Sequence, residues 1–383
     1  MKLFHTYSIL FIFVLFLLQC SKPPIYSNNE VKGICGNGVQ DRGEFGIDCG
    51  GTCPDICTTV RYLEGEIFSR IALSPYYQYI VTGPLIIRDK ASIEILAGTQ
   101  IKIEPNVGAY IAITQGAQMF AWGTKENPIR ISSNALEPKA ADWGGIIFCG
   151  QDSLLDAENK LSDLGFYYFG GDKPFDSSGY LNYLKIEHAG ANYNDSLQFN
   201  ALSFYGVGSY TNVNNVWIEN SAANGIAIEG GSLNLTDIYV NTIGKDGLVI
   251  KDGWRGNGEF WTIHQTDRNG LLIDDYLDVD PSKRNPFSLS NITIIDAQNY
   301  GLYFSRFKGG AAIDSIVIRN STIGFGLSDN KFSDLNLILS NISSFNNGLF
   351  SDNLFFHNLS ASIEVNSDLE TIQIPDWVVS WPE

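Results

Sequence analysis

A glycine that returns at one register through the second half of the chain constrains the fold most. It occupies the same place in four aligned segments, at Gly225, Gly247, Gly270 and Gly301, with steps of 22, 23 and 31 residues. A unit of about 22 residues is too small to bury an apolar core alone, so such units must stack. The register therefore predicts a solenoid.

Apolar residues alternate on both sides of each glycine. One and three positions after it lie Ile226/Ile228, Leu248/Ile250, Leu271/Ile273 and Leu302/Phe304. Nine and seven positions before it lie Val216/Ile218, Ile238/Val240, Trp261/Ile263 and Ile292/Ile294. A period of two is typical of strands with one face on a core. Each unit therefore has at least two strands, and stacked units form parallel sheets.

The residue before each glycine is Asn224, Asp246, Asn269 or Tyr300. Asn and Asp tolerate a left-handed backbone, so we interpret this position as a turn. The long third step indicates an insertion at about 275–285 that should protrude as a loop. A β-sandwich or barrel needs antiparallel hairpins and does not predict this register. We predict an all-β fold, a right-handed parallel β-helix, with the hand taken from the crossover rule.

The chain divides into six segments. They are an export signal at 1–20, a tether at 21–34, a disulfide-rich module at 35–57, a linker or N-terminal cap at 58–82, the β-helix at 83–375 and a C-terminal cap at 376–383. Trp377 and Trp381 are expected to cover the open end of the β-helix.

The first 20 residues carry the export signal. Lys2 is followed by an apolar run of 10 residues, Ile9 to Leu18, which is too short to span a bilayer. The segment LLQC, which ends at Cys20, resembles a bacterial lipobox. The resemblance implies a lipid anchor on Cys20, and we expect the outer membrane as the address. The alternative is an ordinary signal peptide that contains a cysteine.

The charge of the chain narrows the class of partner. The formal net charge is −17 and the pI is about 4.6. Nucleic acids and anionic membrane surfaces attract basic proteins, so neither is an expected partner.

Four of the six cysteines lie close together, at Cys35, Cys49, Cys53 and Cys57. Outside the cytoplasm this clustering predicts disulfides, with three possible pairings. The same stretch carries four oxygen-bearing side chains among glycines, which suit Ca²⁺. They belong to Asn37, Asp41, Glu44 and Asp48. Zinc on the four cysteines and a disulfide knot with solvated acids are the alternatives.

The segment Cys35–Cys57 resembles a repeat of exported bacterial surface proteins, C-x-N-G-x-x-D-x-x-E-x-x-x-D-C-G-G-x-C. The resemblance implies an extracytoplasmic module and no chemistry.

The body is similar to a family of exported bacterial β-helix proteins, often lipoproteins, of no settled activity. The similarity covers Ile93 to Asp275 and lies in GTKENPI at 123–129, DWGGI at 142–146, YLNYLKIE at 180–187 and the pair Asn269-Gly270. The family often has two acids before the turn glycine. This chain keeps at most one, which puts a cation site there in doubt.

Equal register predicts two neighbouring columns of side chains. The first holds Glu229, Lys251 and Asp274, and the second holds Gly230, Asp252, Asp275 and Arg306. Such a face resembles the grooves of pectate lyases, in which acids hold Ca²⁺ and a basic residue takes a proton. The resemblance implies Asp252, Asp275, Lys251 and Arg255 as a candidate catalytic set. The alternative is a solvent-facing ladder of alternating charge.

Other reactive residues are scattered. His188, His264 and His357 lie in different units, so neither a histidine metal cluster nor a serine triad is expected. Cys149 is expected in the core. Several aromatic residues are predicted either to stack on sugars or to cover the core. They are Tyr167, Tyr168, Phe169, Phe175, Trp254 and Tyr276.

We therefore predict a cell-envelope lipoprotein that binds a glycan or another envelope component without catalysis. The alternatives are a lyase or hydrolase of an acidic polysaccharide, and a passive structural or adhesive protein. An enzyme requires acids that converge with a base in an open cleft, outside ion pairs. A binder requires an aromatic-lined face without that arrangement.

Overall fold

The computed structural model describes residues 35–37, 39, 41, 49, 53, 59–275, 286–307, 310–328, 336–345, 363–364 and 374–381. The chain forms two units, Met1–Cys57 and Thr58–Glu383. In the first unit a disulfide joins Cys35 and Cys53, and Cys49 is also disulfide-bonded. Cys57 lies outside the described residues. No helix in the described part of the chain is long and apolar enough to cross a membrane.

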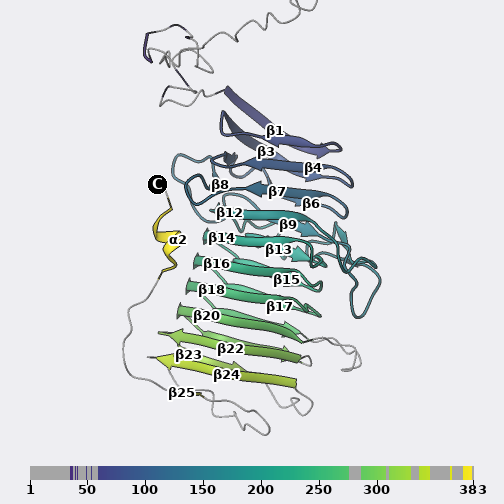
Figure 1. Ribbon diagram of the computed structural model, residues 1–383, viewed down its shortest axis with the longest axis vertical. Helices are drawn as coiled ribbons and strands as arrows, with labels where there is room; N and C mark the ends of the chain where they lie inside the picture. The colour runs from purple at the N-terminus through teal and green to yellow at the C-terminus, as the bar shows by residue number, and fades with distance from the viewer. Residues whose placement is uncertain are drawn as a thin grey trace, which may run out of the picture. The chain divides into compact units, whose positions relative to one another are not determined.

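The second unit is a parallel β-helix, in which the strands of successive coils stack on one another (Figure 1). The strand pairings form three stacks, which we call sheets A, B and C. Sheet A contains β2 (Ile71–Leu73), β4 (Ser92–Leu96), β7 (Gln118–Trp122) and the first halves of β12 (Gly179–Glu187), β14 (Asn212–Ser221), β16 (Asn234–Ile243), β18 (Asn257–Thr266), β20 (Phe287–Ala297), β22 (Gly310–Arg319) and β24 (Asn336–Phe345).

Sheet B adjoins sheet A. It contains the first halves of β1 (Thr59–Ile67) and β3 (Tyr77–Ile87), then β5 (Gln100–Ile103) and β8 (Ile129–Ser133). It continues with the second halves of β12, β14, β16, β18, β20, β22 and β24 and ends with β25 (Ile363–Glu364).

Sheet C closes each coil. It contains the second halves of β1 and β3, then β6 (Ile111–Ile113), β9 (Ile146–Cys149), β13 (Leu202–Tyr205), β15 (Ile226–Glu229), β17 (Leu248–Lys251), β19 (Leu271–Asp275), β21 (Tyr300–Phe307) and β23 (Ile323–Leu327).

The core is the column of inward side chains that the alternation predicts. Ile226 and Ile228 pair with Leu248 and Ile250 on the next coil, and all four are fully buried. Stacking at about 4.8 Å per strand brings each side chain onto its equivalent above and below. The predicted parallel β-helix is confirmed.

The solenoid begins earlier than predicted. Strands β1 and β2 and the first half of β3 already pair within it, although we assigned 58–82 to a linker or cap. Most side chains of β1 are exposed or partly exposed because this strand lies at the first coil. Its sequence therefore lacks the apolar alternation of the later coils.

The register glycines do not form left-handed turns, contrary to our interpretation. Neither they nor the residues before them have positive φ. A Cβ on Gly247 would lie 2.3 Å from Cγ2 of Ile263 and 2.6 Å from the carbonyl oxygen of Gly270. Gly270 and Gly301 face Ile294 and Ile318 in the same way. Glycine is required here because there is no room for a side chain.

The residues before the register glycines form a ladder of side chains. The Nδ2 of Asn224 donates to Oδ1 of Asn200 at 2.9 Å, and the Nδ2 of Asn269 donates to Oδ1 of Asp246 at 2.7 Å. The backbone N–H of Asp246 donates to Oδ1 of Asn224 at 3.1 Å. Asn and Asp therefore satisfy backbone groups between coils.

The left-handed residues lie instead at two corners. The A–B corner has positive φ at Tyr183, Asn215, Asp237, Phe260, Asn291 and Ser315. The B–C corner has positive φ at His188, Asn220, Thr242, Gln265, Asp296 and Asn320. Each column holds one residue per coil from β12 to β22, so the chain bends at the same two places in each of these coils.

The C-terminal helix does not cover the open end. Helix α2 (Asp376–Val379) lies along the side of the β-helix, beside β12, β14 and β16 (Figure 1). Trp381 packs on Trp217 with ring centroids 5.6 Å apart, and both Trp377 and Trp381 contact Tyr183. The correction has a physical reason: outward aromatic rings of sheet B provide an apolar surface that α2 buries.

Candidate functional site

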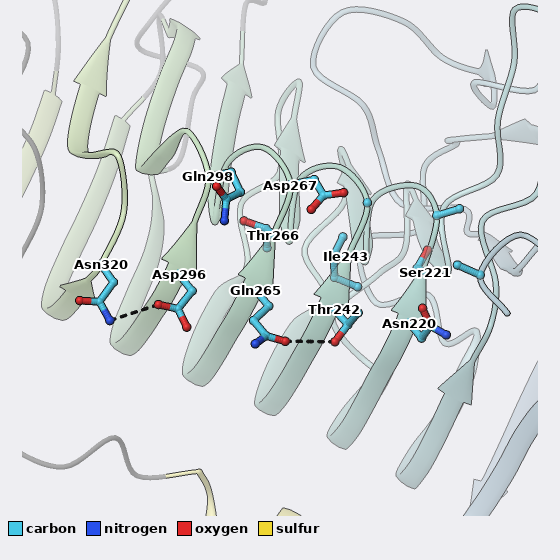
Figure 2. Close-up of a pocket in the computed structure, with 13 residues that line it drawn as sticks. Asn220, Ser221, Thr242, Ile243, Gln265, Thr266, Asp267, Asp296, Gln298 and Asn320 are labelled. Carbon is cyan, nitrogen blue, oxygen red and sulfur yellow. Dashed lines mark hydrogen bonds between the residues drawn. The ribbon is translucent and has the colours of Figure 1, made fainter.

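A polar groove runs along the B–C corner (Figure 2). Its volume is about 720 Å³, within the range of ligand sites. It spans five successive coils and is lined mainly by amide, hydroxyl and carboxylate groups. The lining residues are Ala140, Asn220, Ser221, Ala222, Thr242, Ile243, Gly244, Gln265, Thr266, Asp267, Asp296, Gln298 and Asn320.

One wall of the groove is the left-handed column itself. Asn220, Thr242, Gln265, Asp296 and Asn320 supply one polar side chain per coil, as Figure 2 shows. The Nδ2 of Asn320 donates to Oδ1 of Asp296 at 3.1 Å, and the Oγ1 of Thr242 donates to Oε1 of Gln265 at 3.4 Å. Four of these five residues lie five positions before a register glycine. That repeat is the sequence signal that our reading missed.

The charged groups of the groove are acidic. Asp267 and Asp296 are the two ionisable residues that line it. Asp296 Oδ2 lies 3.2 Å from Nε2 of His264, which sits beside the groove on β18. Arg268 does not line the groove and pairs with the buried Asp246, with Nη1 3.5 Å from Oδ2. The groove therefore offers many hydrogen-bonding groups and little positive charge.

The predicted charged column exists on sheet C. Glu229, Lys251 and Asp274 pair in consecutive strands, as the register indicated. The second column is interrupted after Asp275, because a bulge at Asp274 shifts β21 by one residue. Asp274 therefore pairs with Arg306, and Asp275 pairs with Phe307. The predicted alignment of Arg306 with Asp275 was wrong.

Ion pairs with one long loop engage the basic members of the candidate catalytic set. The loop, residues 150–178, connects β9 to β12 and contains the hairpin of β10 (Lys160–Leu161) and β11 (Tyr168–Phe169). Lys251 Nζ lies 2.5 Å from Oδ2 of Asp163. Arg255 Nη2 lies 2.5 Å from Oδ1 of Asp152, which is fully buried. Both basic residues fasten the loop to the β-helix.

One acidic member of the candidate set is withdrawn from the surface. Asp275 is buried, and its Oδ1 accepts a hydrogen bond from the backbone N–H of Gly253 at 3.1 Å. Asp252 follows the end of β17, one position beyond Lys251. The structure thus places Asp252, Asp275, Lys251 and Arg255 near one edge of sheet C, and none of them lines the polar groove.

Glu229 has a strongly perturbed carboxyl group on this face. Burial, with a smaller contribution from Asp163, raises its pKa to about 7, although Lys251 and Lys160 act in the opposite direction. Burial tends to lower the pKa of Lys251, but Asp163 and other carboxylates raise it overall. Lys251 is therefore charged near neutral pH, whereas Glu229 gains or loses its proton in that range.

The loop buries two of the six aromatic residues that we had considered for sugar stacking. Tyr167 and Phe169 are buried, and they pack with Tyr205 and Cys149 on the outer face of sheet C. Tyr168 and Phe175 are exposed, Trp254 is buried in the core, and Tyr276 lies outside the described residues. Cys149 is buried as expected, although beneath the loop and outside the main core, and burial raises the pKa of its thiol.

The candidate calcium ligands are described in part. Asn37 Nδ2 donates to Oδ2 of Asp41 at 2.9 Å, whereas Glu44 and Asp48 lie outside the described residues. Within the described ranges, no three His, Cys, Asp or Glu side chains are grouped as a metal site.

Three parallel sheets with a lateral groove define a pectate-lyase-like β-helix. The family model for the pectate-lyase like beta helix domain matches residues 65–375, and the chain belongs to this family. No curated protein sequence matches the chain.

Solved structures are similar over much of the chain at low identity. A periplasmic alginate epimerase is 11% identical, with 76% of this chain and 78% of that chain covered and a TM-score of 0.39. The Dettilon tailspike protein is 13% identical, with 76% and 50% covered and a TM-score of 0.35. The A-module of a mannuronan C-5 epimerase from Azotobacter vinelandii is 10% identical, with 82% and 91% covered and a TM-score of 0.25.

Proposed function

We propose that this protein is an exported lipoprotein, anchored through Cys20 in the outer membrane, whose β-helix binds a glycan without catalysis. The observation that carries the proposal is the polar groove along the B–C corner. A groove that crosses five coils offers an elongated polymer a repeated contact, which a compact pocket does not.

The chemistry of the groove suits sugar hydroxyl groups. The Asn and Gln side chains each present a donor and an acceptor, and Thr242 adds a hydroxyl group. Equivalent groups on successive coils lie about 4.8 Å apart. Successive sugars of one chain can therefore meet equivalent groups.

The enzymatic alternative has less support. A lyase needs a basic group that is free to take a proton, and Lys251 and Arg255 each form an ion pair with the 150–178 loop. Asp275 is buried and hydrogen-bonded to the backbone. We assign Lys251 and Arg255 to holding the loop.

Glycan binding is tested with full-length protein in detergent on an array of neutral and acidic polysaccharides. The double variant Thr242→Ala/Gln265→Ala removes two hydrogen-bonding groups from the groove wall. Two such bonds contribute about 1 kcal/mol each, so affinity should fall at least about tenfold.

The control is Asn291→Ala/Ser315→Ala, because these residues share the left-handed backbone but lie at the other corner. Unchanged affinity in the groove variant would refute the site. Absence of binding to every glycan would favour a passive structural role, and cleavage of an acidic polysaccharide that is lost in Asp252→Asn would favour the enzyme.

Calcium binding by the cysteine module is a separate proposal. The amide of Asn37 and the carboxylate of Asp41 lie in hydrogen-bond contact, and both offer oxygen ligands. Titration calorimetry of full-length protein with Ca²⁺ should show one site that Asp41→Asn weakens. Equal binding by the variant would contradict the assignment.

A further inference from the structure

Sheet A carries an exposed aromatic cluster that lies apart from the groove. Trp122 on β7 is 43% exposed, and its ring is nearly parallel to the rings of Phe120 and Tyr180. The centroid distances are 5.7 Å to Phe120 and 4.7 Å to Tyr180. Leu96, on the preceding coil beside Trp122, is 42% exposed. We call these four residues the Trp122 platform.

The next coils continue the platform as a row of uncharged polar residues. Tyr180 pairs with Asn212, which pairs with Asn234, while Asn182 pairs with Asn214, which pairs with Thr236. Asn257 Nδ2 donates to Oδ1 of Asn234 at 3.1 Å. Asn212, Asn234 and Asn257 are all exposed. Thr236 pairs in turn with Glu259, so the apolar surface is followed by amide and hydroxyl groups and then by one carboxylate.

Two other outward aromatic surfaces of the β-helix are covered by its own chain. Helix α2 covers Trp217 and Tyr239 on sheet B, and the 150–178 loop covers Tyr205 on sheet C. The contrast is sharpest for tryptophan. All seven Trp residues are described, and five of them are at most 9% exposed: Trp143, Trp254, Trp261, Trp377 and Trp381. Trp217 is partly buried, which leaves Trp122 as the exposed member.

We infer that the Trp122 platform is a second contact surface for an uncharged glycan, with one sugar on the aromatic platform and the following sugars on the Asn212–Asn257 row. The inference rests on the proposed function, since it assumes that the ligand is a glycan. The apolar face of a pyranose matches an exposed indole, and its hydroxyl groups match amides. A uronate would gain no cationic partner from the residues of this row.

The exposure of Trp122 provides a direct test. Iodide quenching of tryptophan fluorescence in the full-length protein reports mainly on Trp122. The probes are the neutral hexasaccharides of cellulose, mannan, xylan and N-acetylated chitin, with hexagalacturonate as the acidic comparison. At saturation at least one neutral probe should reduce the quenching constant by about half or more, and hexagalacturonate should leave it unchanged.

Affinity measurements separate the platform from the fold. Trp122→Ala should weaken the protecting probe about tenfold, whereas Trp122→Phe should weaken it about threefold, because phenylalanine retains a ring. Tyr168→Ala removes a ring that is 62% exposed on the loop and should have no effect. Equal circular dichroism spectra and melting temperatures would establish that the variants fold.

The outcomes are distinct. If no neutral probe protects Trp122, or if Trp122→Ala binds as the wild type does, the inference is overturned. If the groove variant Thr242→Ala/Gln265→Ala still loses glycan affinity in that case, the proposed function stands without this second surface. If quenching falls with protein concentration without sugar and Trp122→Ala abolishes self-association, the platform is an interface between copies and the inference is overturned.

Discussion

Replacing Glu229 by Gln should stabilise the protein in alkaline solution. The folded-state pKa of Glu229 is about 7, against 4.5 for the ordinary group, and the main cause is burial under the 150–178 loop. Glutamine keeps the shape of the protonated side chain and cannot ionise. The variant therefore removes the free-energy cost of a buried carboxylate.

The sign follows from proton linkage. Because the pKa is raised on folding, the folded state holds the proton more tightly than the unfolded state does. The stabilising contribution of this proton is fully present below pH 4.5 and is lost as the pH rises through 7. A change from 4.5 to about 7 corresponds to roughly 3 kcal/mol at pH 8.5.

Urea unfolding of the wild type and of Glu229→Gln at pH 4 and pH 8.5 measures this difference. The two proteins should have nearly equal stability at pH 4, and the variant should be about 2–3 kcal/mol more stable at pH 8.5. Glu158→Gln, on an exposed position of the same loop, is the matched control and should change stability by less than about 0.5 kcal/mol. A Glu229→Gln protein that is less stable at pH 8.5 would refute the reasoning, because the carboxylate would then be a favourable partner of Lys251.

Three further predictions concern packing and the anchor. Gly247→Ala should destabilise the β-helix by about 2–3 kcal/mol in urea, because its Cβ would overlap Cγ2 of Ile263; a change below about 0.5 kcal/mol would contradict the steric explanation. Trp381→Ala should cost about 3 kcal/mol, since the buried ring packs on Trp217; an unchanged melting temperature would show that α2 adds no stability. Labelling of cells with a palmitate analogue should mark the wild type and not Cys20→Ala, and equal labelling would exclude Cys20 as the anchor.

The sequence was a good guide to the sheets because the information there is local and periodic. Alternation around Gly247 and Gly270 identifies the inward residues, and the stacking of one coil on the next follows from their equal spacing. Our explanation of the glycines as left-handed turns was wrong. An Asn-Gly pair is typical of such turns, whereas the close approach of Ile263 to Gly247 depends on three-dimensional packing. The presence of a glycine does not by itself show whether the position needs a left-handed backbone or lacks room for a side chain.

The surfaces that cover the sheets were less predictable. Lys251 meets a partner 88 positions away and Arg255 one 103 positions away, so no local pattern links them. The candidate catalytic set was chosen from two neighbouring columns of the β-helix and the adjacent Arg255, without the loop that pairs with them. The polar groove, by contrast, follows a repeat as regular as the glycines, with Thr242 and Gln265 at one register. It was overlooked because polar residues near a corner are also expected for solvation alone.

Helix α2 has a consequence for how the molecule unfolds. In a solenoid each coil contacts only its neighbours, so unfolding can proceed inward from either end. Trp381 changes this by joining the last part of the chain to β12, β14 and β16 in the middle of the stack. Loss of the final residues would then loosen the central coils as directly as the terminal ones. Helix α2 therefore links the last part of the chain to the central coils. Removal of α2 should lower both the stability and the cooperativity of unfolding.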